Sequence, residues 1–280
     1  MISELEEKGY TIVPNVLTSD ETTQAKDLFH RWVEQIPGIE DFHSNVNPHG
    51  IFRYHQVGHQ PHAWFIRTRP RVQQPFRDFY QCQDLIVSYD GCGWFNERFK
   101  NKPDLCWTHS DQAPKLTEFE CLQGFVSLTD NVNSSLVVYE GSHKLHADYF
   151  KGDDSGQNWQ MIEPQFLESI QDTKKVLKVS AGDLVLWDSR TFHQNQYGYP
   201  YCEDRLVQYV CYFPREHSRN TPQVQQNRIR YFQEYRTTSH WPCPIRANSL
   251  QPSRKGIKID YNSLPEPNLQ ELIPDIIKLI

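Results

Sequence analysis

The hydrophobic pattern of the N-terminal region predicts helices that pack on a sheet. Thr18-Ser19-Asp20-Glu21 has the spacing of a capping box, in which threonine and glutamate satisfy backbone amides at the start of a helix. Apolar side chains then recur at intervals of three and four residues: Ala25, Leu28, Phe29, Trp32, Val33 and Ile36. They form one apolar stripe on a helix that ends near Pro37-Gly38. Residues 2–13 predict a shorter helix followed by a small strand.

From residue 84 onward the pattern changes to short β-rich runs separated by Gly, Asn, Asp and Pro. The runs are Asp84–Asp90, Cys121–Thr129, Leu136–Glu140, Val176–Val179, Leu184–Trp187 and Leu206–Phe213. Short strands without intervening helices indicate antiparallel pairing. The predicted fold is therefore mainly β with flanking helices: a double-stranded β-helix (jelly-roll, cupin-like) barrel with N-terminal helices packed on one sheet.

We expect residues 1–280 to form a single domain with a jelly-roll core at about 84–215. The segment 39–80 opens with a stretch rich in His, Pro and Gly, and we predict that it is a lid or insert. Residues 216–280 are predicted to contain a C-terminal helix and an irregular tail. No internal repeat or linker demands a second domain.

The C-terminal region carries one clear helix signal. Thr221-Pro222 places proline at a first helical position, where its missing N–H is least harmful, and the helix should run to about Tyr235. A last apolar stretch covers residues 269–280. We predict that it docks on the domain, with a dimer contact as the alternative.

The composition indicates a folded protein of a reducing compartment. Aromatic residues make up 13% of the chain, which a disordered chain would not have. The formal net charge of −6 and the scattered arginines argue against a nucleic-acid partner. Residues 1–8 lack the apolar core of a signal peptide, and no stretch approaches the roughly 18 apolar residues of a membrane span. Seven cysteines without Cys-x-x-Cys indicate free thiols, so we expect a soluble, cytoplasmic protein without a membrane partner.

The candidate chemistry centres on Trp107-Thr108-His109-Ser110-Asp111-Gln112. His109 and Asp111 are two positions apart, so on an extended segment both point to the same face and can share one cation. Two histidines and one carboxylate form the facial triad of non-haem iron oxygenases, which leaves coordination positions open for substrate and oxygen. His193, at the end of a later strand-like run, is predicted to supply the second histidine. Arg205 follows at the start of another apolar strand.

A second His-x-Asp pair occurs at His146-Ala147-Asp148. With 12 histidines in the chain, one such pair is expected by chance. It lies in the segment Ser142–Phe150, which we predict to be a short helix, where residues two apart point to different sides. We therefore interpret this pair as surface structure.

Three further histidines cluster at His55, His59 and His62. Gly58 and Pro61 interrupt any helix that would align them, and no carboxylate or cysteine accompanies them. The favoured interpretation is a solvated loop, with a second metal site or a roof over the active site as alternatives. In the last case the residues touching substrate would be Arg53, Trp64, Arg67 or Arg69.

Several ordered segments carry a family resemblance. They are Glu7–Leu17, Trp107–Gln112, Leu128–Asn131, Leu136–Lys144, Ala181–His193 and Arg205. In this order the chain resembles the phytanoyl-CoA dioxygenase-like (PhyH) branch of the Fe(II)- and 2-oxoglutarate-dependent oxygenases. The resemblance covers roughly residues 5–215 and leaves 39–80 and the tail unaccounted for.

The resemblance implies that His109, Asp111 and His193 are the catalytic metal ligands for Fe(II), and that Arg205 binds the far carboxylate of 2-oxoglutarate. A guanidinium suits this role because it is planar, always charged and bidentate. The implied reaction consumes O2, converts 2-oxoglutarate to succinate and CO2, and oxidises a C–H bond. Halogenating relatives replace the metal-binding carboxylate by a small residue, so Asp111 favours hydroxylation. Other residues that could reach the co-substrate are Asn195, Gln123 and Asn96.

The favoured function is thus a dioxygenase that hydroxylates a small or medium organic substrate, with a peptide substrate left open. One alternative is a cupin-type dioxygenase that keeps the iron but does not use 2-oxoglutarate. The other is a jelly-roll metal-binding or scaffold protein without turnover. The sequence leaves the substrate and the oligomeric state open, and we expect specificity to reside in residues 39–80 and in the tail.

Overall fold

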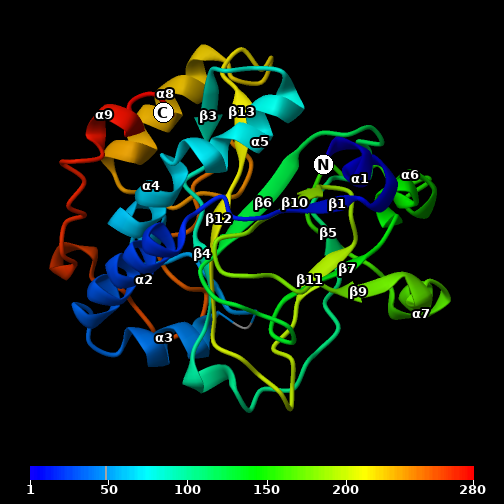
Figure 1. Cartoon of the computed structure of the whole chain (residues 1–280), viewed down its shortest axis with the longest axis horizontal. Coiled ribbons are helices and arrows are strands. Elements are labelled where there is room, and N and C mark those ends of the chain that lie inside the picture. Colours follow the sequence, from blue (N-terminus) through cyan, green and yellow to red (C-terminus); the bar gives the residue numbers. More distant parts are fainter. Residues whose placement is uncertain (48) are drawn as a thin grey trace.

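The computed structural model describes residues 1–47 and 49–280 and contains two antiparallel sheets that form a jelly roll (Figure 1). The larger sheet has the strand order β1-β10-β6-β12-β4-β2. Its strands are β1 Tyr10–Val13, β2 Ile51–Phe52, β4 Cys92–Phe95, β6 Leu122–Ser127, β10 Leu184–Asp188 and β12 Arg205–Val210. The predicted jelly-roll fold, mainly β with flanking helices, is confirmed.

The smaller sheet has the strand order β8-β5-β11-β7-β9. Its strands are β5 His109–Ser110, β7 Leu136–Tyr139, β8 Gln160–Met161, β9 Lys174–Val176 and β11 His193–Asn195. A separate pair joins β3 Leu85–Val87 to β13 Tyr212–Pro214. The predicted strand at Val176–Val179 lies earlier than expected, and Val179 forms only an isolated bridge with Asn131.

Helices cover the outer side of the larger sheet and the rim of the smaller one (Figure 1). The α-helices are α1 Ile2–Lys8, α2 Ser19–Glu34, α3 Ile39–Val46, α4 Pro61–Arg67, α5 Pro70–Tyr80, α6 His146–Tyr149, α7 Pro164–Ser169, α8 Pro222–Gln233 and α9 Ile273–Ile276. Short 3-10 helices are η1 Val57–His59, η2 Glu97–Phe99, η3 Ser142–Lys144, η4 Gln171–Thr173 and η5 Tyr261–Ser263.

The N-terminal helix α2 forms as its sequence predicts. Thr18 and Glu21 make the reciprocal hydrogen bonds of a capping box, with donor–acceptor distances of 3.1 and 2.9 Å. The buried side of the helix carries Phe29, whose ring meets the ring of Trp94 of β4 edge to face at 5.1 Å. The apolar stripe therefore holds α2 against the outer face of the larger sheet.

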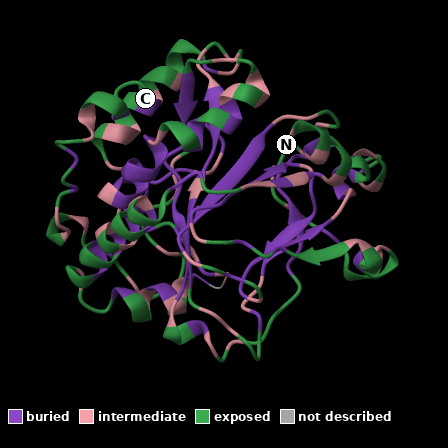
Figure 2. Ribbon diagram, in the orientation of Figure 1, coloured by how far each residue is buried: buried purple, intermediate pink, exposed green. Residues whose placement is uncertain are grey.

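The described part of the segment 39–80 is folded and its three clustered histidines are buried, so the prediction of a solvated loop around them was wrong. His55, His59 and His62 are all buried, and Figure 2 shows much of this helical layer as buried (purple) toward the sheet. The ring of His62 packs against Phe29 of α2, with ring centroids 5.0 Å apart. Gly58 lies within η1 and Pro61 starts α4, and the break between these two helices directs the imidazoles into different parts of the core.

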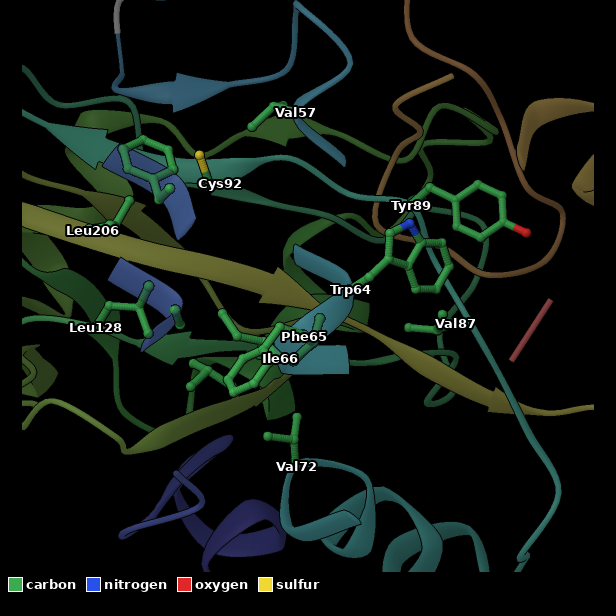
Figure 3. Packing of buried hydrophobic residues seen from close by; sticks show 14 of the residues in the cluster. Val57, Trp64, Phe65, Ile66, Val72, Val87, Tyr89, Cys92, Leu128 and Leu206 are labelled. Atoms are coloured by element: carbon green, nitrogen blue, oxygen red, sulfur yellow. The ribbon is translucent and has the colours of Figure 1, made fainter. Parts of the chain in front are cut away.

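Helix α4 inserts the largest apolar side chains of this segment into the main core. Figure 3 shows Trp64, Phe65 and Ile66 directed into a cluster that also contains Val87 of β3 and Tyr89 just after this strand. The rings of Trp64 and Tyr89 lie 5.5 Å apart. Helix α4 is therefore part of the main hydrophobic core.

The C-terminal stretch docks on the domain, as predicted. Leu269, Ile276 and Leu279 are buried in the main core, and the Leu279 carbonyl accepts a hydrogen bond of 3.1 Å from the amide of Val87. The helix predicted from Thr221-Pro222 is α8, whose first turn is capped by the Thr221 hydroxyl.

Two remaining expectations concern the cysteines and the membrane. All seven cysteines are free, as predicted, although Cys106 is exposed. No helix among the described residues has the length and apolar character needed to span a bilayer.

Candidate active site

Strand pairing in the smaller sheet brings His109 and His193 face to face. The two residues are directly opposite partners of β5 and β11, and their ring centroids are 4.4 Å apart. Asp111 follows β5 two positions after His109, so its carboxylate points to the same side. Its oxygens lie 3.6 Å from Nε2 of His109 and 3.4 Å from Nε2 of His193. The three ligand atoms thus lie within 4.8 Å of one another, close enough to hold one metal ion.

Backbone carbonyls orient both imidazoles. Nδ1 of His109 donates to the carbonyl of Trp107 at 3.2 Å, and Nδ1 of His193 donates to the carbonyl of Thr191 at 2.8 Å. Because a carbonyl can only accept, the proton must reside on Nδ1 in each neutral ring, which leaves Nε2 as the lone-pair donor. Each histidine therefore presents Nε2 to the same point.

The charge states of the triad suit a cation. Burial lowers the pKa of His109 to about 3, so its ring is neutral and able to bind a metal at ordinary pH. Burial acts to raise the pKa of Asp111, but the imidazoles of His240, His109 and His193 outweigh it and the net pKa is lowered. One carboxylate beside two imidazoles, each of which can bind through Nε2, is the donor set that suits a divalent cation.

Gln123 of β6 contacts the carboxylate from the larger sheet. Its Nε2 donates to Oδ2 of Asp111 at 3.2 Å, whereas its Oε1 is buried without a partner among the described residues. Asn195 of β11 donates through Nδ2 to the Tyr209 hydroxyl at 3.0 Å, and its Oδ1 is likewise unpaired within the described structure. Two of the three residues predicted near the co-substrate, Gln123 and Asn195, therefore have unpaired polar atoms in the site.

Arg205 is a buried cation without an acid partner in the described part of the chain. Its side chain is 1% exposed, and Nη1 and Nη2 both lack a hydrogen-bond partner there. The guanidinium lies between the rings of Phe95 and Phe125, at 5.3 and 5.1 Å from their centroids. Burial lowers the pKa of Arg205 and the Tyr209 hydroxyl opposes this change. Two unpaired guanidinium nitrogens in an apolar setting are a strong signal for a carboxylate ligand.

A cavity of about 400 Å³ opens beside the triad. Its wall combines strands of both sheets with the segment 39–80 and the C-terminal region. The lining residues include His49, Ile51, Arg53, Asp90, Trp107, Gln123, Leu136, Trp159, Trp187, Asn195, Tyr209, Thr238, Ser239, His240 and Asn248, in addition to the triad. A volume of this size accommodates a co-substrate together with part of a small organic molecule.

Several lining residues were not identified from the sequence, among them Asp90, Tyr209 and Trp159. Tyr209 lies four positions after Arg205 on one strand, and the period of two could have placed both on the same face. Trp159 and His240 come from loops and carried no sequence signal. The Nε2 atom of His240 lies 3.4 Å from Oδ2 of Asp111, which makes it a third imidazole at the carboxylate.

Other sequence candidates lie elsewhere. Asn96 does not belong to the described cavity wall, and its Oδ1 instead accepts from the amide of Arg98 at the start of η2. His146 and Asp148 lie on α6, as predicted for the second His-x-Asp pair. The interpretation as surface structure was wrong for His146, which is buried and whose ring contacts the Gln112 carbonyl at 3.2 Å.

Comparison with known proteins agrees with this arrangement. A family model described as "Phytanoyl-CoA dioxygenase (PhyH)" matches residues 5–196. "Ava biosynthesis cluster protein O" of Aspergillus versicolor is 24% identical over 263 residues, covering 85% of this chain and 84% of that protein. The structure of HygX from Streptomyces hygroscopicus with nickel and 2-oxoglutarate is similar with a TM-score of 0.53 and 18% identity, over 76% of this chain and 85% of HygX.

A further similar structure is the epimerase SnoN, solved with Fe3+, alpha-ketoglutarate and nogalamycin RO. Its TM-score is 0.50 at 16% identity, over 76% of this chain and 81% of SnoN. The family match and the triad define an enzyme of the iron- and 2-oxoglutarate-dependent class. This chain belongs to the phytanoyl-CoA dioxygenase (PhyH) family, since the family model matches more than half of its length.

Proposed function

We propose that this enzyme hydroxylates a C–H bond of a small or medium organic molecule, with Fe(II), 2-oxoglutarate and O2, and releases succinate and CO2. The observation that carries the proposal is the buried guanidinium of Arg205, which lies on the same strand as Tyr209. Neither of its terminal nitrogens has a hydrogen-bond partner among the described residues. A dicarboxylate with one end at Arg205 and the other at the metal ligands would satisfy both buried charges.

Each residue has a separate task in this proposal. His109, Asp111 and His193 hold the metal, which together with 2-oxoglutarate and O2 supplies the oxidant for the C–H bond. Arg205 binds the far carboxylate of 2-oxoglutarate through two parallel hydrogen bonds. Asn195 has an unpaired Oδ1 on the cavity wall, which suits it to orient the co-substrate or its water.

Aromatic residues close the site against water. The ring of Trp107 stacks beside His109 at 4.8 Å, and the ring of Trp187 lies 5.4 Å from His193. Apolar walls next to the metal ligands protect a reactive oxidant from side reactions. This arrangement supports oxidation of a bound substrate rather than simple metal storage.

The choice of hydroxylation rests on Asp111. The carboxylate occupies the coordination position that halogenating relatives leave open for chloride, so hydroxyl transfer to the substrate is favoured. SnoN is an epimerase, and epimerisation would leave the substrate's mass unchanged, whereas hydroxylation adds one oxygen atom. The mass of the product therefore separates the two outcomes.

Substrate selection is assigned to residues outside the barrel strands. His49 and Arg53 come from the segment 39–80, and Thr238, His240 and Asn248 come from the tail. We propose that residues 1–280 work as one catalytic domain, in which these two segments form the outer wall of the cavity. A small molecule is favoured because one relative is named for a biosynthesis cluster and HygX was solved with hygromycin B.

The test is 2-oxoglutarate turnover by the purified enzyme. Succinate should form with Fe(II), O2 and 2-oxoglutarate, and addition of a true substrate should stimulate it. Asp111→Ala should abolish both metal binding and succinate formation. Asp148→Ala, at the exposed aspartate of the second His-x-Asp pair, is the matched control and should behave as the wild-type enzyme.

The alternatives predict different results. Turnover that survives Arg205→Ala would favour a cupin-type dioxygenase that does not use 2-oxoglutarate. Tight metal binding without decarboxylation or an oxygen requirement would favour a scaffold protein. Failure of the wild-type protein to bind 2-oxoglutarate in the presence of metal would overturn the proposed function.

A further inference from the structure

A second carboxylate, that of Asp90, faces the cavity without a full set of partners. Asp90 lies between β3 and β4, lines the same cavity as the triad and is 7% exposed. Its Oδ1 accepts a hydrogen bond of 2.9 Å from the amide of Gly91. Its Oδ2 is buried and has no hydrogen-bond partner among the described residues. A buried acceptor without a hydrogen bond is unfavourable unless a ligand donates one to it.

The surrounding protein does not explain Asp90 as a structural ion pair. The nearest buried cation, Arg67, directs Nη2 to the backbone carbonyl of Asp90 at 2.6 Å and Nη1 to the carbonyl of Gly58. Among the described residues, no salt bridge joins a cation to the Asp90 carboxylate, and its Oδ2 has no hydrogen-bond partner. Burial raises the pKa of Asp90 to about 6, although His240 and Arg67 oppose the change, so the carboxylate is held in an unfavourable setting.

The opposite walls of the cavity are aromatic. The ring of His49 stacks on Trp107 at 3.8 Å with an interplanar angle of 16°, and the ring of Trp159 lies 5.5 Å from that of His109. These surfaces bind apolar or planar groups and offer few polar atoms. Apart from the metal triad, the cavity thus combines aromatic wall surfaces with one further carboxylate, that of Asp90.

Asp90 is also close to the metal ligands in electrostatic terms. The imidazole of His240 lowers the pKa of both Asp90 and Asp111, and Asp111 in turn raises that of Asp90. Asp90 and the three triad residues line one cavity of about 400 Å³, so a group bound at Asp90 shares that cavity with the metal ligands. This placement suits a residue that fixes which substrate carbon faces the metal.

We propose that Asp90 anchors the primary substrate by accepting a hydrogen bond from a protonated amine or a hydroxyl on an otherwise apolar body. The inference rests on the proposed function and adds the chemical class of its substrate. The amine is the preferred donor, because a cation also compensates the charge of the carboxylate. A carboxylate at the same position of the substrate would be repelled.

Four probes of matched size test this inference: 2-phenylethylamine, 2-phenylethanol, propylbenzene and 3-phenylpropanoate. Their affinities are measured by ligand-observed NMR with the protein loaded with Ni(II) and 2-oxoglutarate. The wild-type protein should bind the amine and the alcohol about tenfold or more tightly than propylbenzene. Wild-type protein that binds the amine no better than propylbenzene overturns the proposal.

Two variants separate the amine from the hydroxyl. Asp90→Asn keeps an acceptor but removes the charge, so the preference for the amine should fall about tenfold while the alcohol is less affected. Asp90→Leu should remove both preferences and improve binding of propylbenzene. An unchanged order of affinities in both variants contradicts the role of Asp90.

The matched control is Asp183→Asn. Asp183 is also buried, but its two carboxylate oxygens accept backbone hydrogen bonds from Asn15 and Ser180. This variant should lose thermal stability and keep the order of probe affinities. Asp90→Asn should instead change the order of probe affinities and keep the thermal stability. A loss of Tm without a change in the order of probe affinities would assign Asp90 a purely structural role.

Separate measurements distinguish failure of this inference from failure of the proposed function. Metal and 2-oxoglutarate binding are measured first by calorimetry, and both should be unchanged in the Asp90 variants. If the wild-type protein does not bind 2-oxoglutarate, the proposed function fails, and the probe series is then measured with Ni(II) alone. If 2-oxoglutarate binds but no amine preference is found, only the substrate assignment fails.

Discussion

His109 and His193 are opposite partners in neighbouring strands, and each ring is held by the carbonyl of the residue two positions before it. The two imidazoles are therefore fixed by the backbones of β5 and β11 before any metal binds. Such a preformed pair of histidines needs little rearrangement on metal binding. The affinity of the site for a metal then depends mainly on the groups that orient the third ligand, the carboxylate of Asp111.

Gln123 is the side chain that holds the carboxylate from the larger sheet, through its hydrogen bond to Asp111. Gln123→Leu should weaken Ni(II) or Mn(II) binding by about 10- to 100-fold, the usual effect of removing a hydrogen-bond partner of a metal ligand. Calorimetric titration of the metal measures this change, and circular dichroism checks that the fold is kept. An affinity equal to that of the wild-type protein would show that Gln123 does not orient Asp111.

Arg205→Met should have opposite effects on co-substrate binding and on stability. Affinity for 2-oxoglutarate should fall at least about thirtyfold, because a buried charged contact is lost. The free energy of unfolding of the protein without ligands should stay the same or rise, since an unpaired buried guanidinium is replaced by an apolar chain. Calorimetry and urea unfolding give the two values, and a large loss of stability would mean that Arg205 has a structural partner.

Arg228→Met provides the contrast. This arginine is as deeply buried, but its guanidinium donates to the carbonyls of Val87 and Pro242. Its replacement leaves both carbonyls unpaired, so the free energy of unfolding should fall by about 3 kcal/mol. Amide hydrogen exchange should increase in the segment around Pro242, which carries His240. Unchanged exchange there would show that Arg228 does not hold this wall of the cavity.

Buried histidines should make the protein sensitive to acid. Burial lowers the pKa of each of His43, His59 and His62 to about 3. In the unfolded chain these rings take up protons below about pH 6.5, whereas in the folded chain they stay neutral until about pH 3. Stability is therefore complete above about pH 6.5 and is lost as the pH falls toward 3, by up to about 1.4 kcal/mol per pH unit for each ring.

His62→Phe isolates one of these contributions. Neither ring nitrogen of His62 has a hydrogen-bond partner in the described structure, and the ring packs against Phe29 and Trp32. Phenylalanine should keep this packing, and the loss of stability between pH 7 and pH 5 in urea unfolding should shrink by about 2 kcal/mol. The control is His30→Phe, at an exposed histidine, which should leave the loss of stability between pH 7 and pH 5 unchanged.

The fold could be predicted wherever a local pattern decided it. The capping box and apolar stripe of α2 depend only on residues a few positions apart, and they form as predicted. The prediction failed at His55, His59 and His62, because polar composition indicated solvent exposure. Their burial depends on Phe29 and other side chains from distant elements, which the local sequence does not contain.

The sequence by itself determined that His109 and Asp111 share one face, because the period of two in an extended chain is a property of the backbone. Only the tertiary structure decided that His193 lies opposite His109 and that Arg205 and Asp90 keep unpaired polar atoms beside it. Strand pairing joins residues far apart in the chain, and desolvation depends on every neighbour that excludes water. Both are long-range properties, so the substrate-binding wall of this enzyme follows from the packed structure rather than from any one motif.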